Sequence, residues 1–126
     1  MEFTVSTDTR LDVVDVTDRV AAAVPAGTDG TVTVFVEHTT AGVTINEAEP
    51  RLLSDVRTVL ADLVPDDGWA HDELDGNADS HLRALLLGPS ETVPVAGGDL
   101  ALGRWQSVLF VECDGPRERT VRVLDE

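Results

Sequence analysis

Residues 31–46 read TVTVFVEHTTAGVTIN and contain the clearest secondary-structure signal of the chain. In Thr31–Glu37 every second residue is valine, which predicts a strand with one buried face. His38 falls on that same face, where the strand ends. Ala41–Asn46 predicts a further strand or extended segment. A sheet with a histidine at the end of one strand is therefore expected.

The flanking sequence predicts more strands and two to three helices. Glu2–Thr7 and Leu11–Val16 alternate like two strands that pair with each other across a tight connection. Helices are expected over Arg19–Val24, from Pro50 to Val64, and from a cap at Asp79 or Ser80 through Leu87. The last third predicts strands at Glu91–Val95, Leu100–Leu102, Trp105–Glu112 and Thr120–Leu124. Together these elements predict a single α+β domain over residues 1–126 with a largely antiparallel sheet.

The helix that starts at Pro50 has its apolar residues at helical spacing, which predicts one apolar stripe. The residues of this stripe are Leu52, Leu53, Val56, Val59, Leu60 and Leu63.

The chain is strongly acidic, with 24 acidic residues, nine basic residues and a formal charge of -15. All nine basic residues are arginine. This surface favours a halophilic protein, since high salt screens the repulsion between like charges. A merely acidic protein from a GC-rich genome is the alternative. No partner made of nucleic acid is expected, because binding to phosphate backbones needs clustered lysine or arginine.

No apolar run approaches the length needed to cross a bilayer, so no membrane partner is expected. The first residues, MEFTVSTDTR, alternate like a strand and differ from a signal peptide. The single cysteine, Cys113, has no internal disulfide partner. These features predict a cytoplasmic protein.

The loop from Trp69 to His81 (WAHDELDGNADSH) holds two of the three histidines, His71 and His81. Neutral imidazole is the commonest nitrogen ligand of transition metals. Asp72 and Asp75 are placed to orient metal-bound imidazoles. A solvated acidic loop is the alternative, because the spacing matches no common metal motif.

The third histidine, His38, precedes Thr39 and Thr40, whose hydroxyl and N–H groups could bind a phosphate next to Gly42. A satisfied core histidine is the alternative. Glu47 follows and could add a polar wall. Further along the chain, arginines can bind phosphate bidentately, as expected of Arg104, Arg117 and Arg119. The alternative is that these arginines pair with Glu112, Asp114 and Glu118.

Four motifs resemble the YjbQ-like family, known as secondary thiamine-phosphate synthases. They are HTTAGVTINE (38–47), WAHDELDGNADSHLRA (69–84), SETVPVAGGDLALGRWQSV (90–108) and ECDGPRER (112–119). The resemblance implies a homotrimer in which His38, His71 and His81 gather around a metal or an oxyanion. It also implies that Asp75, Asn77, Ser80 and Gln106 lie near this site.

The leading hypothesis is an enzyme that acts on a small phosphorylated or anionic substrate, with thiamine-phosphate synthesis as the activity that the resemblance implies. His38, His71 and His81 would hold a divalent metal ion (zinc, magnesium, manganese or nickel). The catalytic candidates are Glu47, Asp75 and Gln106, and the substrate-binding candidates are Thr39, Thr40, Asn77, Ser80, Arg104 and Arg117. The alternatives are a metal-dependent hydrolase and a non-catalytic trimer that binds a metal or an anion.

Overall fold

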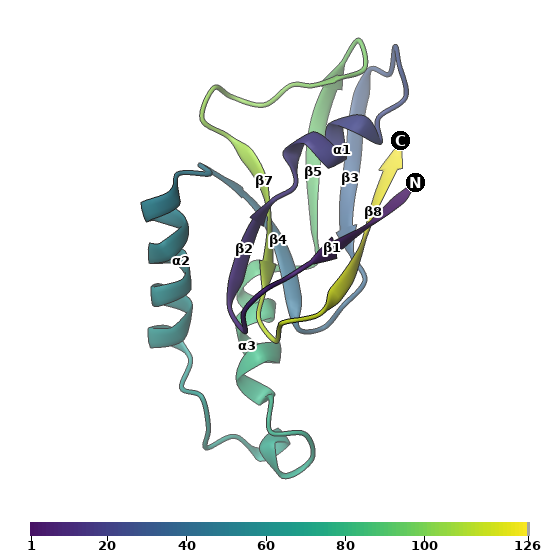
Figure 1. The fold of residues 1–126 in the computed structure, drawn as a ribbon. Coiled ribbons are helices and arrows are strands. Elements are labelled where there is room, and N and C mark those ends of the chain that lie inside the picture. Colours follow the sequence, from purple (N-terminus) through teal and green to yellow (C-terminus); the bar gives the residue numbers. More distant parts are fainter. Residues whose placement is uncertain (126) are drawn as a thin grey trace.

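The two strands expected around His38 are confirmed as β3 (Gly30–Val36) and β4 (Ala41–Asn46), but they lie in different sheets. The computed structural model describes residues 1–125. One sheet has five strands in the order β1-β8-β3-β5-β6, and the other has three in the order β2-β7-β4, with all pairs antiparallel. The α+β prediction is therefore confirmed, and Figure 1 shows α2 standing beside the smaller sheet.

The remaining strands are β1 (Glu2–Ser6), β2 (Asp12–Asp15), β5 (Ser90–Ala96), β6 (Asp99–Leu100), β7 (Ser107–Glu112) and β8 (Glu118–Asp125). The helices are α1 (Thr17–Ala22), α2 (Pro50–Leu63), the short 3-10 helix η1 (Ala70–Glu73) and α3 (Ala78–Leu87). Buried valines from both sheets dominate the main core.

The expected pairing of the first two strands is wrong. β1 pairs with β8, whereas β2 pairs with β7 in the other sheet. Alternation of apolar residues defines which face of a strand is buried, but it does not specify the partner strand. Between β1 and β2 the chain passes from one sheet to the other, and it carries Arg10 to a contact with Asp79 of α3.

Two helices differ from the prediction, α3 in where it begins and α2 in which of its residues are buried. α3 begins at Ala78, so Asp79 and Ser80 lie within its first turn and are fully buried. In α2 only Leu60 is buried, while Val59 and Leu63 of the predicted stripe are 48% and 64% exposed. No helix within residues 1–125 is long and apolar enough to span a membrane.

Candidate functional site

His38 is held at the end of β3 by the main chain of β8. The backbone N–H of Thr120 donates a hydrogen bond of 2.8 Å to Nε2 of the imidazole. The pKa of His38 is lowered from 6.5, first by burial and then by the nearby positive charge of Arg119. The ring is therefore neutral at pH 7, as the acceptor role of Nε2 also requires.

A buried ion pair fixes the segment that follows His38. Arg119 is 2% exposed and forms a bidentate pair with the fully buried Glu112. The Arg119 guanidinium also donates to the carbonyl and, at 2.8 Å, to the hydroxyl of Thr40. Thr7 donates its hydroxyl to Glu112 at 2.8 Å. The Thr40 hydroxyl thus binds a protein group, while Thr39 is exposed beside it.

His81 lies in the first turns of α3, and a second buried network positions this helix. Asp79 accepts two hydrogen bonds of 2.7 Å from Arg10 and one from Arg83, which is 1% exposed. The hydroxyl of Ser80 lies 3.1 Å from Arg10, so the buried Ser80 also binds protein. The other end of α3 lies against β4, where a Cβ on Gly42 would come within 2.8 Å of the Gly88 carbonyl oxygen.

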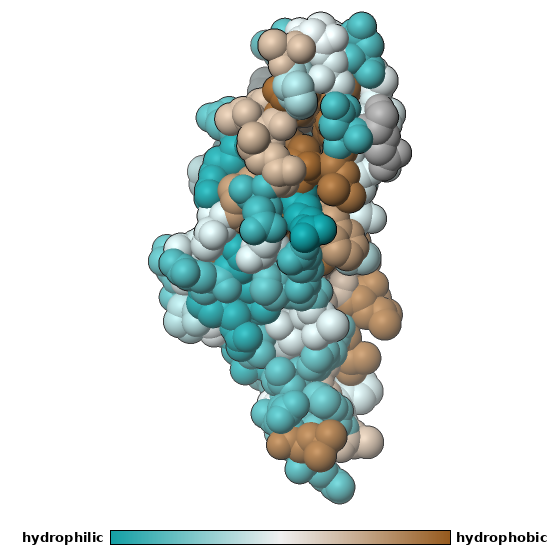
Figure 2. Space-filling model, turned by 90° about the vertical axis from the view of Figure 1, so that its right-hand side faces the viewer, coloured by the Kyte–Doolittle hydropathy of each residue, from teal (hydrophilic) through white to brown (hydrophobic). Residues whose placement is uncertain are grey.

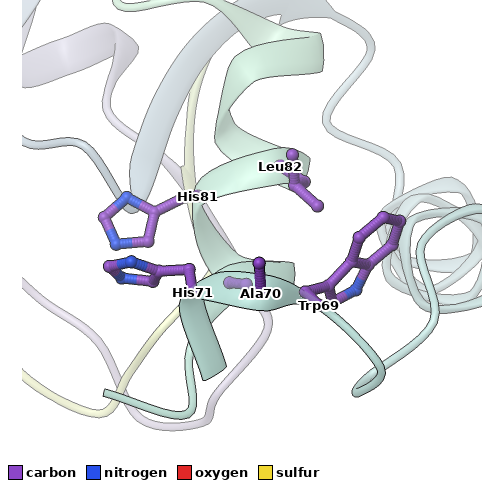
Figure 3. Close-up of a pocket in the computed structure, with 6 residues that line it drawn as sticks. Trp69, Ala70, His71, His81 and Leu82 are labelled. Atoms are coloured by element: carbon purple, nitrogen blue, oxygen red, sulfur yellow. The ribbon is translucent and has the colours of Figure 1, made fainter. Parts of the chain in front are cut away.

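His71 comes from η1 and contacts His81. The two ring centroids are 4.9 Å apart at an interplanar angle of 86°, an edge-to-face contact. Nε2 of His71 is buried without a hydrogen-bond partner among the described residues, and Asp75 Oδ2 lies 3.6 Å away, beyond hydrogen-bond distance. Figure 3 shows the two imidazoles next to each other, with Trp69 at the opposite end of the labelled group.

His81 is shared by two neighbouring pockets. One pocket, of about 440 Å³, is lined by His38 and His81 together with Thr39, Ala41, Ala84, Leu85, Gly88 and Pro89. The other, of about 360 Å³, is lined by His71 and His81 together with Trp69, Ala70, Ala78 and Leu82. The three histidines therefore lie near one another as two pairs, His38 with His81 and His71 with His81, and His81 belongs to both pairs.

The histidines do not form a ready metal site. Among residues 1–125, no group of three or more histidine, cysteine, aspartate or glutamate side chains is arranged to hold a metal ion. Nε2 of His38 already accepts a hydrogen bond, and Nε2 of His71 is buried against its neighbours. The present arrangement therefore does not fit a metal, and metal binding by these residues stays a prediction.

Two predicted site residues, Glu47 and Arg104, lie elsewhere in the same chain. They line a separate pocket with Asp15, Ala48, Glu49, Pro50, Trp105 and Ser107. Arg104 stacks over the Trp105 ring, with its guanidinium carbon 4.8 Å from the ring centroid. Glu47 follows the end of β4 that is remote from His38, and the length of this strand alone is about 20 Å at ~3.3 Å per residue.

Three other predicted site residues have protein partners. Gln106 accepts a hydrogen bond of 2.8 Å from the Gly103 N–H and so closes its own turn. Asn77 donates to Asp114 at 3.0 Å, although its own side-chain oxygen is buried and unpartnered among the described residues. Arg117 pairs with Asp114 at 3.1 Å. The alternative that Arg117 and Arg119 pair with nearby carboxylates is therefore the one observed.

Several groups that build the site leave little or no signal in the sequence. The N–H of Thr120 leaves no signal in the sequence, because any residue except proline supplies one. Arg83 is a buried charge inside an apolar helix, and an arginine among Leu82, Ala84 and Leu85 was the available signal. Burial raises the pKa of Cys113 to about 12, so this thiol is not a nucleophile here.

Comparisons with known proteins place the chain among relatives of similar length. Residues 1–124 match the family model described as UPF0047 protein YjbQ-like. A UPF0047 protein of Archaeoglobus fulgidus is 50% identical, and the match covers 98% of both chains. The UPF0047 protein YugU of Bacillus subtilis is 36% identical over 92% of this chain and 90% of its own.

Solved structures extend the same match to the fold. A protein of Aeropyrum pernix is 47% identical with a TM-score of 0.96, and the match covers 100% of this chain and 96% of that one. A protein of Sulfolobus solfataricus, described as YbjQ-like, is 36% identical with a TM-score of 0.90 over the same shares of the chains. The chain belongs to the YjbQ-like (UPF0047) family.

Proposed function

We propose that the chain binds a small phosphorylated or otherwise anionic molecule in the pocket between His38 and His81. The observation that carries this proposal is that the imidazoles of His38 and His81, which come from separate motifs, line one open pocket. Ring N–H groups and the exposed Thr39 hydroxyl can donate hydrogen bonds to oxyanions. His71 would support His81 through their edge-to-face contact.

The proposed activity is an enzymatic reaction of a small phosphorylated substrate. The reaction to test first is thiamine-phosphate synthesis, which joins a hydroxymethylpyrimidine diphosphate to a thiazole phosphate and releases diphosphate. Imidazole N–H groups would stabilise the charge that develops on the leaving group. Asp75 Oδ2 lies 3.6 Å from Nε2 of His71, and a small approach of the two groups would let the carboxylate accept a hydrogen bond from the ring and orient it. A host that lacks its own thiamine-phosphate synthase tests the reaction, because failure of this chain to restore growth without thiamine would contradict it.

We further propose a cytoplasmic homotrimer adapted to high salt. Several large apolar side chains of α3 and the loop before it are exposed, including Leu74 at 80% and Leu85 at 74%. Figure 2 shows apolar residues open to solvent along one edge and at the lower tip of the molecule. Association would cover such surface. Light scattering at molar salt would test the trimer, and a monomer at every concentration would contradict it.

Binding of inorganic phosphate should depend on His81 more than on His71. Loss of a hydrogen bond to a charged group costs about 1.5–3 kcal/mol, so His81→Ala should weaken binding by about tenfold or more. His71→Ala is the matched control, because His71 lines the neighbouring pocket and not this one, so its loss should change the affinity less. Calorimetric titration measures both. Unchanged affinity in His81→Ala, with the fold intact, would refute the proposed site.

A further inference from the structure

We infer that His38 serves the proposed anion site as a hydrogen-bond donor through Nδ1 and does not serve as a metal ligand. This inference rests on the proposed function and specifies how the site recognises its ligand. The contact with Thr120 of β8 determines which nitrogen of the ring carries the proton.

The backbone N–H of Thr120 defines the tautomer of His38. An amide N–H is always a donor, so Nε2 at 2.8 Å from Thr120 N must supply a lone pair. A neutral imidazole carries its one proton on the other nitrogen. The ring proton of His38 therefore lies on Nδ1.

Nδ1 has no acceptor within the part of the chain that the structure describes. No hydrogen bond from this atom to another residue is present, and it is not among the buried polar atoms without partners. The atom is therefore open to solvent on a ring that forms part of the wall of the pocket shared with His81. A ligand with an oxygen acceptor can complete the hydrogen bonding of Nδ1.

The contact with Thr120 belongs to a rigid part of the fold. The residue before it, Arg119, holds the carbonyl and hydroxyl of Thr40 through its guanidinium and is itself paired with Glu112. The two neighbours in β8 thus hold both ends of the segment His38–Thr40. A ring flip that freed Nε2 would leave the Thr120 N–H without this acceptor.

This arrangement discriminates between the two ligand classes considered for the site. A transition metal requires a lone pair on the imidazole, and His38 has none free when Nε2 accepts and Nδ1 is protonated. An oxyanion requires hydrogen-bond donors, and Nδ1 supplies one. The ligand recognised by His38 is therefore an oxyanion, such as a phosphate or a carboxylate.

Long-range proton–nitrogen NMR of the histidine rings tests this assignment directly in the full-length protein. Only three histidines contribute signals, and single His→Gln variants assign them. We expect His38 to show a protonated Nδ1 and a free lone pair on Nε2, both before and after addition of inorganic phosphate. A proton on Nε2, or stoichiometric broadening or shift of the His38 nitrogens by Zn²⁺, would overturn the inference.

Two substitutions at His38 provide a second test. The amide nitrogen of asparagine overlays Nδ1, whereas the amide of glutamine reaches the position of Nε2. We therefore expect His38→Asn to retain more phosphate affinity than His38→Gln, which should bind about tenfold more weakly than the wild type. Equal loss in two folded variants would contradict a donor role for Nδ1. If the wild type binds no phosphate at all, the proposed function fails, whereas the tautomer is still read from the free protein.

Discussion

Replacement of Glu112 by glutamine should lower the free energy of unfolding by about 3–5 kcal/mol, the usual cost of removing one partner from a buried ion pair. Glu112 is fully buried, and its carboxylate binds the guanidinium of Arg119 and the hydroxyl of Thr7. Glutamine retains the size of the side chain but leaves the Arg119 charge without compensation. Denaturant unfolding in molar potassium chloride measures the change.

Glu118→Gln is the matched control, because Glu118 is an exposed residue of β8, the next strand in sequence. Its change should stay within about 0.5 kcal/mol. The pair joins β7 of the smaller sheet to β8 of the larger one. A Glu112→Gln variant as stable as the control would show that this connection does not stabilise the fold.

The Glu112–Arg119 ion pair also predicts how the stability of the fold depends on pH. Burial acts to raise the pKa of Glu112, but hydrogen bonds from Arg119, the Asp114 N–H and Thr7 outweigh it, and the pKa is lowered from 4.5. A carboxylate with a lowered pKa contributes stability above its ordinary pKa and loses it as the pH falls through the lower one. As the pH falls below 4.5, the free energy of unfolding should therefore decrease less in Glu112→Gln than in the wild type.

Replacement of Arg83 by methionine should also destabilise the protein, by about 3 kcal/mol or more. The buried guanidinium donates to the carbonyls of Leu60 and Val64 at 2.9 and 2.7 Å, at the end of α2, and to the carboxylate of Asp79. Methionine retains an apolar stem of similar length. The end of α2 and the buried Asp79 would then lose their common donor.

Arg51→Met, at the start of α2, is the control for Arg83→Met, because the Arg51 side chain is 92% exposed. Circular dichroism and denaturant unfolding compare the two variants. Hydrogen exchange should show the end of α2 opening first in Arg83→Met. Equal stability of the two variants would show that Arg83 does not stabilise the contact between α2 and α3.

The strands and helices were largely predictable from the sequence, because strong alternation and helical spacing report local structure. The strand TVTVFVE became β3, and the helix from Pro50 became α2. The partners of the strands were not predictable, since β1 and β2 pair in different sheets although they are consecutive. Pairing depends on long-range packing that alternation does not encode.

The candidate site was also only partly predictable from the sequence. Scarcity of histidine and the family resemblance indicated His38, His71 and His81, and the structure brings them together pairwise through His81. The roles of the polar residues between them were less predictable. Thr40 and Ser80 carry hydroxyls suited to a phosphate, yet Arg119 and Arg10 bind these hydroxyls. A short motif shows which groups are available, but only the fold shows which of them are already occupied.

The most direct test of a shared anion pocket is a titration with inorganic phosphate in which the ring carbon-bound protons of all three histidines are followed by NMR. His38 and His81 line one pocket, so their signals should shift together along one saturable curve, with a smaller change at His71. If His38 and His81 shift with different affinities, or not at all while the protein stays folded, the two residues do not bind one anion and the account is contradicted.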